Sequence, residues 1–105
     1  MAIPNDARTL YLLLYEVVDD FLTQRTLYRG DHLQAVAEAH ARGELLQGGA
    51  LVDPADGAAL LFATDDRSVV ERFADNDPYV KAGLVKSWKV RKWNAVIGPD
   101  GVTAP

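Results

Sequence analysis

The sequence predicts an α+β fold of the ferredoxin-like type, in which the elements follow the order β-α-β-β-α-β and form one antiparallel sheet. Two observations predict this fold. Segments 27–42 and 66–76 have helical spacing, and each lies between segments with strand character. The two central strand segments are joined by residues 53–57, Asp-Pro-Ala-Asp-Gly, a strong turn sequence that makes them a hairpin.

The first strand is expected over Thr9–Val18, where apolar residues occupy both alternating faces. A single layer of helices covers only one face of a sheet, so the second face of this strand is expected to meet a partner subunit. A polar loop is expected from Asp19 to Thr26, with Phe21 and Leu22 as its only apolar anchors.

The first helix is expected over residues 27–42 and ends before Gly43, since glycine is the usual residue just past a helix C-terminus. Its inward stripe is expected at positions i, i+3, i+4 and i+7: Leu33, Val36, Ala37 and His40. Four residues turn about 400°, so His32 lies about 40° from Val36, at the edge of this stripe.

The second strand, 45–52, contains Gly48-Gly49, and such glycines mark a bulge or a close approach by a ligand or another backbone. The third strand is expected over residues 58–63. Asp66 is the expected N-cap of the second helix, which extends through Asn76. Its inward residues are Val69, Val70 and Phe73.

A short helical turn is expected to begin at Pro78 and to end at Gly83. The last strand is expected over 86–97. Residues 98–105 show no periodicity and are expected to form a flexible tail. The chain is therefore predicted to be one domain over residues 1–97, with its core at 9–97.

Composition limits the classes of function. The chain has 105 residues, 49% of them hydrophobic, and a formal charge of −4, which disfavours a nucleic-acid partner. Cysteine is absent, which excludes disulfides and thiolate chemistry. The longest apolar stretch, Leu10–Tyr15, is far too short for a membrane span, and no secretory signal is recognised, so a cytoplasmic location is expected.

The last strand carries Lys86, Lys89, Arg91 and Lys92 together with Trp88 and Trp93. This set resembles a basic aromatic platform for single-stranded nucleic acid. The solvated charged edge of a sheet explains it at least as well, because charges there discourage unwanted strand pairing.

Two short motifs carry the candidate chemistry. Residues 29–33, Arg-Gly-Asp-His-Leu, open the first helix, and residues 77–79, Asp-Pro-Tyr, close the second. A histidine paired with a carboxylate is a proton-handling unit, because the carboxylate fixes which ring nitrogen carries hydrogen. His32 and Asp77 are therefore the candidate catalytic pair, and Arg29 could meet an anion.

Each of these residues also has a structural interpretation. His32 could pack at the helix start with its nitrogens satisfied locally. Asp77 precedes Pro-Tyr and is a good N-cap. Tyr79 could donate a hydrogen bond into the cleft or simply pack. His32 and His40 are about 12 Å apart along the helix and cannot chelate one metal, so no metal site is expected.

These residues resemble the YCII-related (YciI-like) family of the dimeric α+β barrel superfamily. The resemblance runs from about Thr9 to Ile97. It rests on Arg29-x-x-His32-Leu33, on Gly43-x-Leu45-Leu46 followed by Gly48-Gly49, on Asp77-Pro78-Tyr79, on Ala82-Gly83 and on Trp93. It implies a dimer formed by packing sheets face to face, and a His-Asp pair at a small-molecule cleft, at His32 and Asp77. Arg29 is the matching arginine.

The leading hypothesis is cofactor-free acid-base catalysis, of lyase, dehydrohalogenase-like or isomerase type, on a small cyclic or aromatic organic acid or phenol. His32 and Asp77 would be catalytic, and Arg29, Tyr79, Gly48 and Gly49 would bind substrate. The alternatives are a dimeric module that binds a small metabolite without turnover, and a structural interaction domain with no small ligand. Nucleoside triphosphates and dinucleotides are not expected, since the chain lacks their glycine-rich loops.

Overall fold

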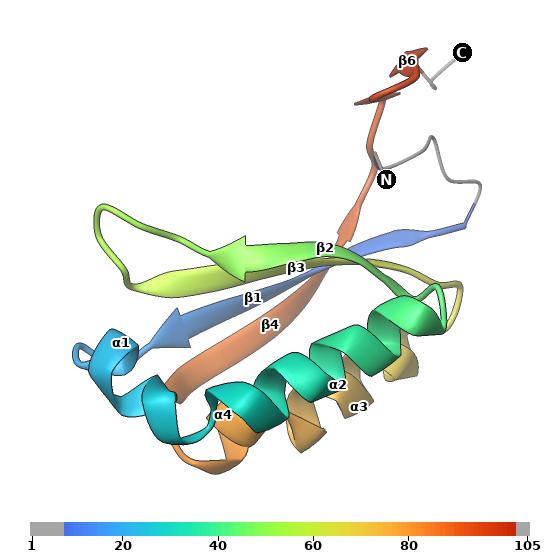
Figure 1. Cartoon of the computed structure of the whole chain (residues 1–105). Coiled ribbons are helices and arrows are strands. Elements are labelled where there is room, and N and C mark those ends of the chain that lie inside the picture. The colour runs from blue at the N-terminus through green and yellow to red at the C-terminus, as the bar shows by residue number, and fades with distance from the viewer. Residues whose placement is uncertain (1–7, 103–105) are drawn as a thin grey trace.

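The computed structural model describes residues 8–102, and its main body is a four-stranded antiparallel sheet with helices on one face (Figure 1). The strand order is β2-β3-β1-β4, the ferredoxin-like arrangement that the sequence predicts, so the predicted fold class is confirmed. The strands are β1 (Leu10–Val17), β2 (Leu45–Ala50), β3 (Gly57–Ala63) and β4 (Val85–Trp93). The helices of the body are α1 (Phe21–Gln24), α2 (Arg29–Ala41), α3 (Arg67–Asn76) and α4 (Pro78–Lys81).

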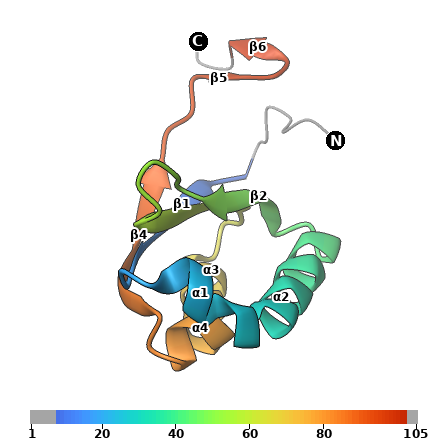
Figure 2. The same ribbon diagram turned by 60° about the vertical axis from the view of Figure 1, so that its left-hand side comes forward.

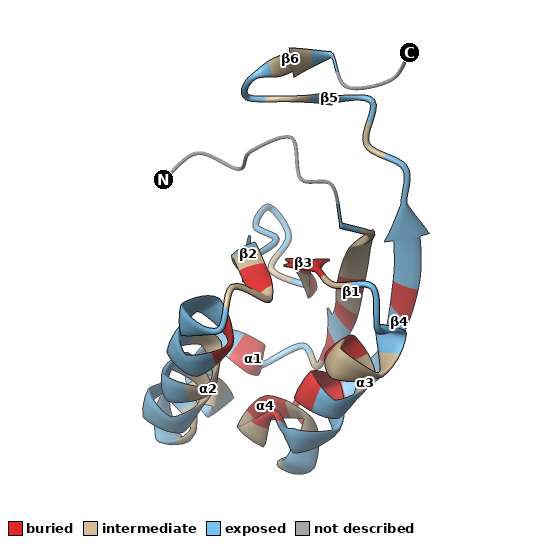
Figure 3. Cartoon of the chain, turned by 90° about the vertical axis from the view of Figure 1, so that its right-hand side faces the viewer, coloured by how far each residue is buried: buried red, intermediate tan, exposed pale blue. Residues whose placement is uncertain are grey.

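The core lies between the sheet and the helices, where the buried residues gather (Figure 3). Alternation along β1 turns Leu13, Tyr15 and Val17 toward the helices, and all three are buried. Phe62 of β3 and Phe73 of α3 meet edge to face in this layer, with ring centroids 5.3 Å apart. The core is therefore formed by the alternate side chains of the strands that face the helices.

The other face of the sheet, here called the outer face, has no helix over it (Figure 1). Leu10, Leu12 and Leu14 of β1 lie on it and are half-buried. Their register partners are Ala63, Leu61 and Ala59 in β3, and Trp93, Arg91 and Lys89 in β4. The expected second apolar face of the first strand is present, whereas its contact with a partner subunit stays a prediction.

The segment expected as a polar loop, residues 19–26, is instead largely helical. It forms α1 and a 3₁₀ turn, η1 (Arg25–Leu27), and only one of its two expected anchors is buried. Phe21 is buried, whereas Leu22 is 49% exposed. Helical pieces of three or four residues depend on tertiary packing rather than on propensity, so periodicity could not reveal them.

Helix α2 begins at Arg29 rather than at Leu27, and its inward side differs from the predicted stripe. The residues turned toward the core are His32, Ala35, Val36 and Ala39, while Leu33 is 46% exposed. This set has the predicted spacing but is shifted by one residue along the helix. The prediction assigns the large Leu33 to the core, whereas the helix turns Ala35 and Ala39 inward. His40 is exposed, and its Nδ1 lies 2.8 Å from the Leu45 carbonyl oxygen. His32 consequently lies on the buried side of the helix.

Strand β2 pairs with β3 as the expected hairpin, but its irregularity is not at the glycines. The register shifts between Leu45 and Gln47, so Leu46 is the extra residue, while Gly48 and Gly49 pair regularly with Leu60 and Ala59. The strand ends at Ala50 rather than at residue 52. The shift places Leu45, which is buried, opposite Phe62.

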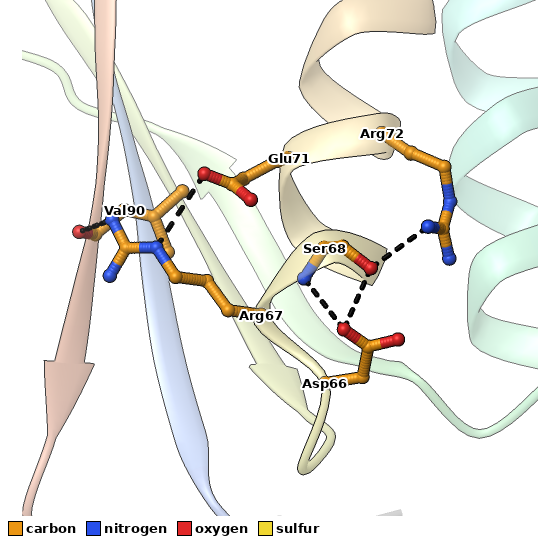
Figure 4. A network of polar contacts seen from close by, with 6 residues as sticks. All are labelled: Asp66, Arg67, Ser68, Glu71, Arg72 and Val90. Carbon is orange, nitrogen blue, oxygen red and sulfur yellow. Dashed lines mark hydrogen bonds and ion pairs between the residues drawn. The ribbon is translucent and has the colours of Figure 1, made fainter.

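Helix α3 begins at the expected cap. Asp66 Oδ1 accepts hydrogen bonds from the Ser68 amide and hydroxyl at 2.9 and 2.7 Å, and Arg72 donates to the same hydroxyl at 2.8 Å (Figure 4). The Ser68 side chain and backbone hold the pKa of Asp66 below its usual value. Val70 and Phe73 are buried as predicted, whereas Val69 is half-buried.

Helix α4 begins at Pro78 and ends before Gly83, as predicted. Gly83 has a φ of +78°, the left-handed conformation that glycine adopts at helix ends, and Gly43 after α2 has the same φ. The last strand, β4, is an edge strand, which supports the interpretation of its lysines and arginines as a charged sheet edge.

The C-terminal segment differs from the prediction. Strand β4 ends at Trp93, and β5 (Ile97–Gly98) pairs with β6 (Gly101–Val102) as a small hairpin that lies apart from the sheet (Figure 2). Pro99 and Asp100 at its tip, followed by Gly101, form a favourable turn sequence that explains the pairing. The part of the expected flexible tail at 103–105 lies outside the described residues, as do residues 1–7.

Candidate active site

Asp77 lies between α3 and α4 and is the one fully buried charged residue in the described part of the chain. Its Oδ1 accepts a hydrogen bond from the Tyr79 amide at 3.0 Å, so it caps α4 as the sequence suggests. Pro78 at the first helical position suits this arrangement, because proline has no amide hydrogen to satisfy.

The same carboxylate contacts His32. The His32 Nδ1 lies 2.8 Å from Asp77 Oδ1, and the histidine side chain is 14% exposed. The first turn of α2 and the α3–α4 junction lie at the same end of the molecule (Figure 1). One carboxylate therefore both caps α4 and contacts the histidine, two roles that the sequence allows together.

Tyr15 completes the surroundings of Asp77 and was missed by the sequence analysis. Its hydroxyl donates to Asp77 Oδ2 at 2.7 Å, from the helix-facing side of β1. The alternation of β1 could have placed Tyr15 in the core, but the packing of α4 on the sheet decides what its hydroxyl meets. Asp77 thus has three hydrogen-bonding neighbours, on three elements, and no arginine or lysine pairs with it among residues 8–102.

These contacts orient the histidine ring. An ionised carboxylate only accepts hydrogen bonds, so the tautomer of the neutral ring that fits this contact carries its hydrogen on Nδ1. The Nε2 atom is then the unprotonated nitrogen, free to accept a proton.

Tyr79 packs on the face of the His32 ring. The two rings stack with centroids 3.9 Å apart and planes 13° from parallel, and Phe21 meets the Tyr79 ring edge-on at 5.3 Å. The Tyr79 hydroxyl is buried and has no hydrogen-bond partner among the described residues. Tyr79 therefore holds the imidazole ring in place by packing.

A cavity of about 340 Å³ opens beside this group. His32 and Tyr79 line it together with Arg29, Gly48 and Gly49, so the structure brings these predicted site residues to one cavity, while Asp77 lies behind the histidine. The other lining residues are Tyr15, Phe21, Arg25, Leu33, Val36, Ala50, Ala58 and Leu60. Arg25 and Phe21 come from the segment expected to be a loop, which is why the sequence did not place them here.

Gly48 and Gly49 make different contributions to the cavity wall. A Cβ on Gly48 would lie 3.2 Å from the Leu60 Cγ, whereas one on Gly49 would meet nothing within 4 Å. Gly48 shares the helix-facing side with Leu60, so the absence of its side chain leaves room beside the histidine. No three His, Asp or Glu residues of the described chain are grouped as a metal site would require.

The Tyr15 hydroxyl makes the free energy of unfolding depend on pH. Burial, followed by the charge of Asp77 and the hydrogen bond to it, raises the pKa of Tyr15 well above its ordinary value of 10.0. Above that pH the unfolded chain releases a proton that the folded chain keeps, so this group makes the free energy of unfolding fall with rising pH. The expected slope from this group is up to about 1.4 kcal/mol per pH unit.

Urea unfolding between about pH 9 and 11 checks this prediction. The Tyr15→Phe variant is expected to lose this part of the slope, because it has no phenolic proton to retain. Tyr11→Phe, on the same strand but with no hydrogen bond to Asp77, is the matched control. The same slope in wild type and Tyr15→Phe would contradict the buried Tyr15–Asp77 contact.

Within the described residues, no helix is long and apolar enough to cross a membrane.

No curated protein sequence matches the chain. Among solved structures, it is similar to 5-chloro-2-hydroxyhydroquinone dehydrochlorinase from Burkholderia phenoliruptrix AC1100, in complex with 2,5-dihydroxybenzoquinone. The identity is 24% and the TM-score 0.69, over 81% of this chain and 93% of that one.

A second similar structure is a candidate antibiotic biosynthesis monooxygenase from Bacteroides thetaiotaomicron VPI-5482. The identity is 11% and the TM-score 0.57, over 88% of this chain and 92% of that one. At these identities both structures support the ferredoxin-like α+β fold alone. The model of the YCII-related domain matches residues 9–94, most of the chain. The chain therefore belongs to the YCII-related family, as the motifs around His32 and Asp77 suggested.

Proposed function

We propose that the protein is a small-molecule enzyme of lyase or isomerase type that uses His32 as its acid-base residue and needs no cofactor. The observation that carries this proposal is the contact between a nearly buried histidine and a fully buried carboxylate at the wall of a cavity. A ring nitrogen held this way is oriented before substrate arrives, so little reorganisation is needed when the proton moves.

The proposed step is proton removal from a hydroxyl or an activated carbon of a cyclic or aromatic substrate. The His32 Nε2 takes the proton, Asp77 stabilises the imidazolium, and Arg29 meets the negative charge that develops on the substrate. In an elimination, the freed electron pair forms the new double bond and expels a leaving group such as halide. The imidazolium then returns its proton to solvent, so the net loss is one proton and one halide ion.

One of the two similar solved structures supports this choice of substrate. It is named as a dehydrochlorinase of a hydroxyhydroquinone and holds a quinone. The cavity of this chain, at about 340 Å³, is at the small end of the usual range for ligand sites, which suits a single ring. Halogenated hydroquinones are therefore the first compounds to assay.

The experiment is a panel of halogenated hydroquinones, other phenols and lactones, followed by halide release and by mass spectrometry of the products. Turnover of at least one compound is expected. Binding of a panel compound without any product, even with protein in molar excess, would overturn the catalytic proposal. That outcome would favour the alternative, a module that sequesters a small metabolite.

We also propose that the protein forms a homodimer through the outer face of the sheet. Three leucines of β1 lie on this face in a row, and Trp93, which pairs with Leu10, is 45% exposed. A row of large apolar side chains without a covering layer favours association. Light scattering is expected to give twice the mass of the chain, and a monomer at micromolar concentration would contradict the dimer.

A further inference from the structure

Two arginines, Arg25 and Arg29, line the cavity that contains His32. They are four residues apart in the sequence, Arg25 on η1 and Arg29 in the first turn of α2. Arg25 is half-buried and Arg29 is exposed. A pair of guanidinium groups at one cavity offers up to ten N–H donors to an incoming ligand.

The charge of this cavity is opposite to that of the whole protein. The chain carries a formal charge of −4, yet no aspartate or glutamate lines the cavity. Among residues 8–102, neither Arg25 nor Arg29 is in an ion pair, whereas Arg42 pairs with Glu44 at 2.8 Å and Arg67 with Glu71 at 3.6 Å. Positive charge without a protein partner, focused at a cavity, attracts anions.

Arg25 is also held in place by contacts that do not use its hydrogen-bond donors. Its guanidinium carbon lies 5.6 Å from the centroid of the buried Phe21 ring. Phe21 meets Tyr79 edge-on, and Tyr79 stacks on His32. A guanidinium that lies over a ring keeps its N–H groups available for a planar anion such as a carboxylate. The ring contacts therefore connect the position of Arg25 with that of the histidine.

We propose, building on the function proposed above, that Arg25 binds a substrate carboxylate at this cavity, while Arg29 beside it meets the charge that develops in the reaction. The proposed substrate is then a single-ring hydroxy acid, with its carboxylate at Arg25 and its reacting hydroxyl or carbon at His32. The body of the ring lies against the apolar wall formed by Leu33, Val36 and Leu60. Arg25 is a specificity-determining residue for this acid.

The test measures binding to the full chain by calorimetry, with 2,5-dihydroxybenzoate as the acid and 1,4-dihydroxybenzene as its neutral counterpart. The wild type is expected to bind the acid at least about tenfold more tightly, as a charge-assisted hydrogen bond supplies. Arg25→Gln is expected to remove most of this preference and to leave the binding of the neutral compound unchanged. Arg25→Lys, which keeps the charge without the fork, is expected to be intermediate.

Arg42→Gln is the matched control, because Arg42 is a surface arginine outside this cavity with a carboxylate partner. It is expected to leave the preference unchanged. Equal affinity for the two compounds in the wild type, or the same preference in wild type and Arg25→Gln, would overturn the carboxylate site.

This experiment separates the inference from the proposed function, since binding is measured without turnover. An acid that binds through Arg25 but is never converted would leave the carboxylate site standing and count against catalysis. Turnover of neutral phenols by a wild type that binds the acid and the neutral compound equally well would count against the carboxylate site and leave catalysis standing.

Discussion

His32→Gln is expected to lower turnover of the substrate found in the panel by about 10²- to 10⁴-fold, the usual contribution of an acid-base residue. Glutamine can still accept or donate a hydrogen bond near Asp77, but it cannot take up a proton at neutral pH. The loss should fall on kcat, because His32 acts on the moving proton, while the arginines that hold the ligand are unchanged. Steady-state kinetics of the two proteins measure it.

The chain has its own control for this substitution. It contains two histidines, and His40 is exposed near the far end of α2, where its Nδ1 lies 2.8 Å from the Leu45 carbonyl oxygen. His40→Gln is expected to keep wild-type kcat. Turnover that survives in His32→Gln would show that another group moves the proton.

Asp77→Ala is expected to lower the free energy of unfolding by about 3 to 5 kcal/mol, as does removal of one member of a buried pair. The truncation leaves the Tyr15 hydroxyl, the Tyr79 amide and the His32 Nδ1 without their acceptor. Each unsatisfied buried donor costs about 1 to 3 kcal/mol, less where water can enter. Since small domains have about 5 to 15 kcal/mol in total, the variant should be close to unfolding at physiological temperature.

Chemical unfolding followed by circular dichroism checks this expectation. Asp75→Ala is the matched control, because Asp75 lies two residues away on the exposed side of α3. It is expected to change stability by no more than about 0.5 kcal/mol. A cost below about 1 kcal/mol for Asp77→Ala would contradict the three-donor environment of the carboxylate.

The fold was largely predictable because its signals are local. The alternation along β1, the turn at residues 53–57 and the glycines after α2 and α4 each act on a few neighbouring residues. The prediction differs from the structure where tertiary packing, rather than local sequence, determines the conformation. Segment 21–27 is helical and buries Phe21 against Tyr79, and α2 turns its alanines, not Leu33, toward the core.

The candidate site was predictable in part. His32, Asp77 and Arg29 stand out by their motifs and by the family resemblance, whereas the distance between His32 and Asp77 depends on how two helices lie on the sheet. Tyr15 could have been assigned to the core by alternation, but not to Asp77. Arg25 could not have been placed at the cavity, because its segment has no readable periodicity.

The most direct test of the proposed role of His32 is the tautomer of its ring, measured by ¹⁵N NMR in the wild type and in Asp77→Asn. With only two histidines, the signals are assigned by comparison with His40→Gln. We predict that wild-type His32 carries its hydrogen on Nδ1, with Nε2 free to accept a proton, and that Asp77→Asn changes both the tautomer and the titration of the ring. The same tautomer and the same titration in both proteins would contradict a histidine oriented by Asp77 and would leave Asp77 as a helix cap.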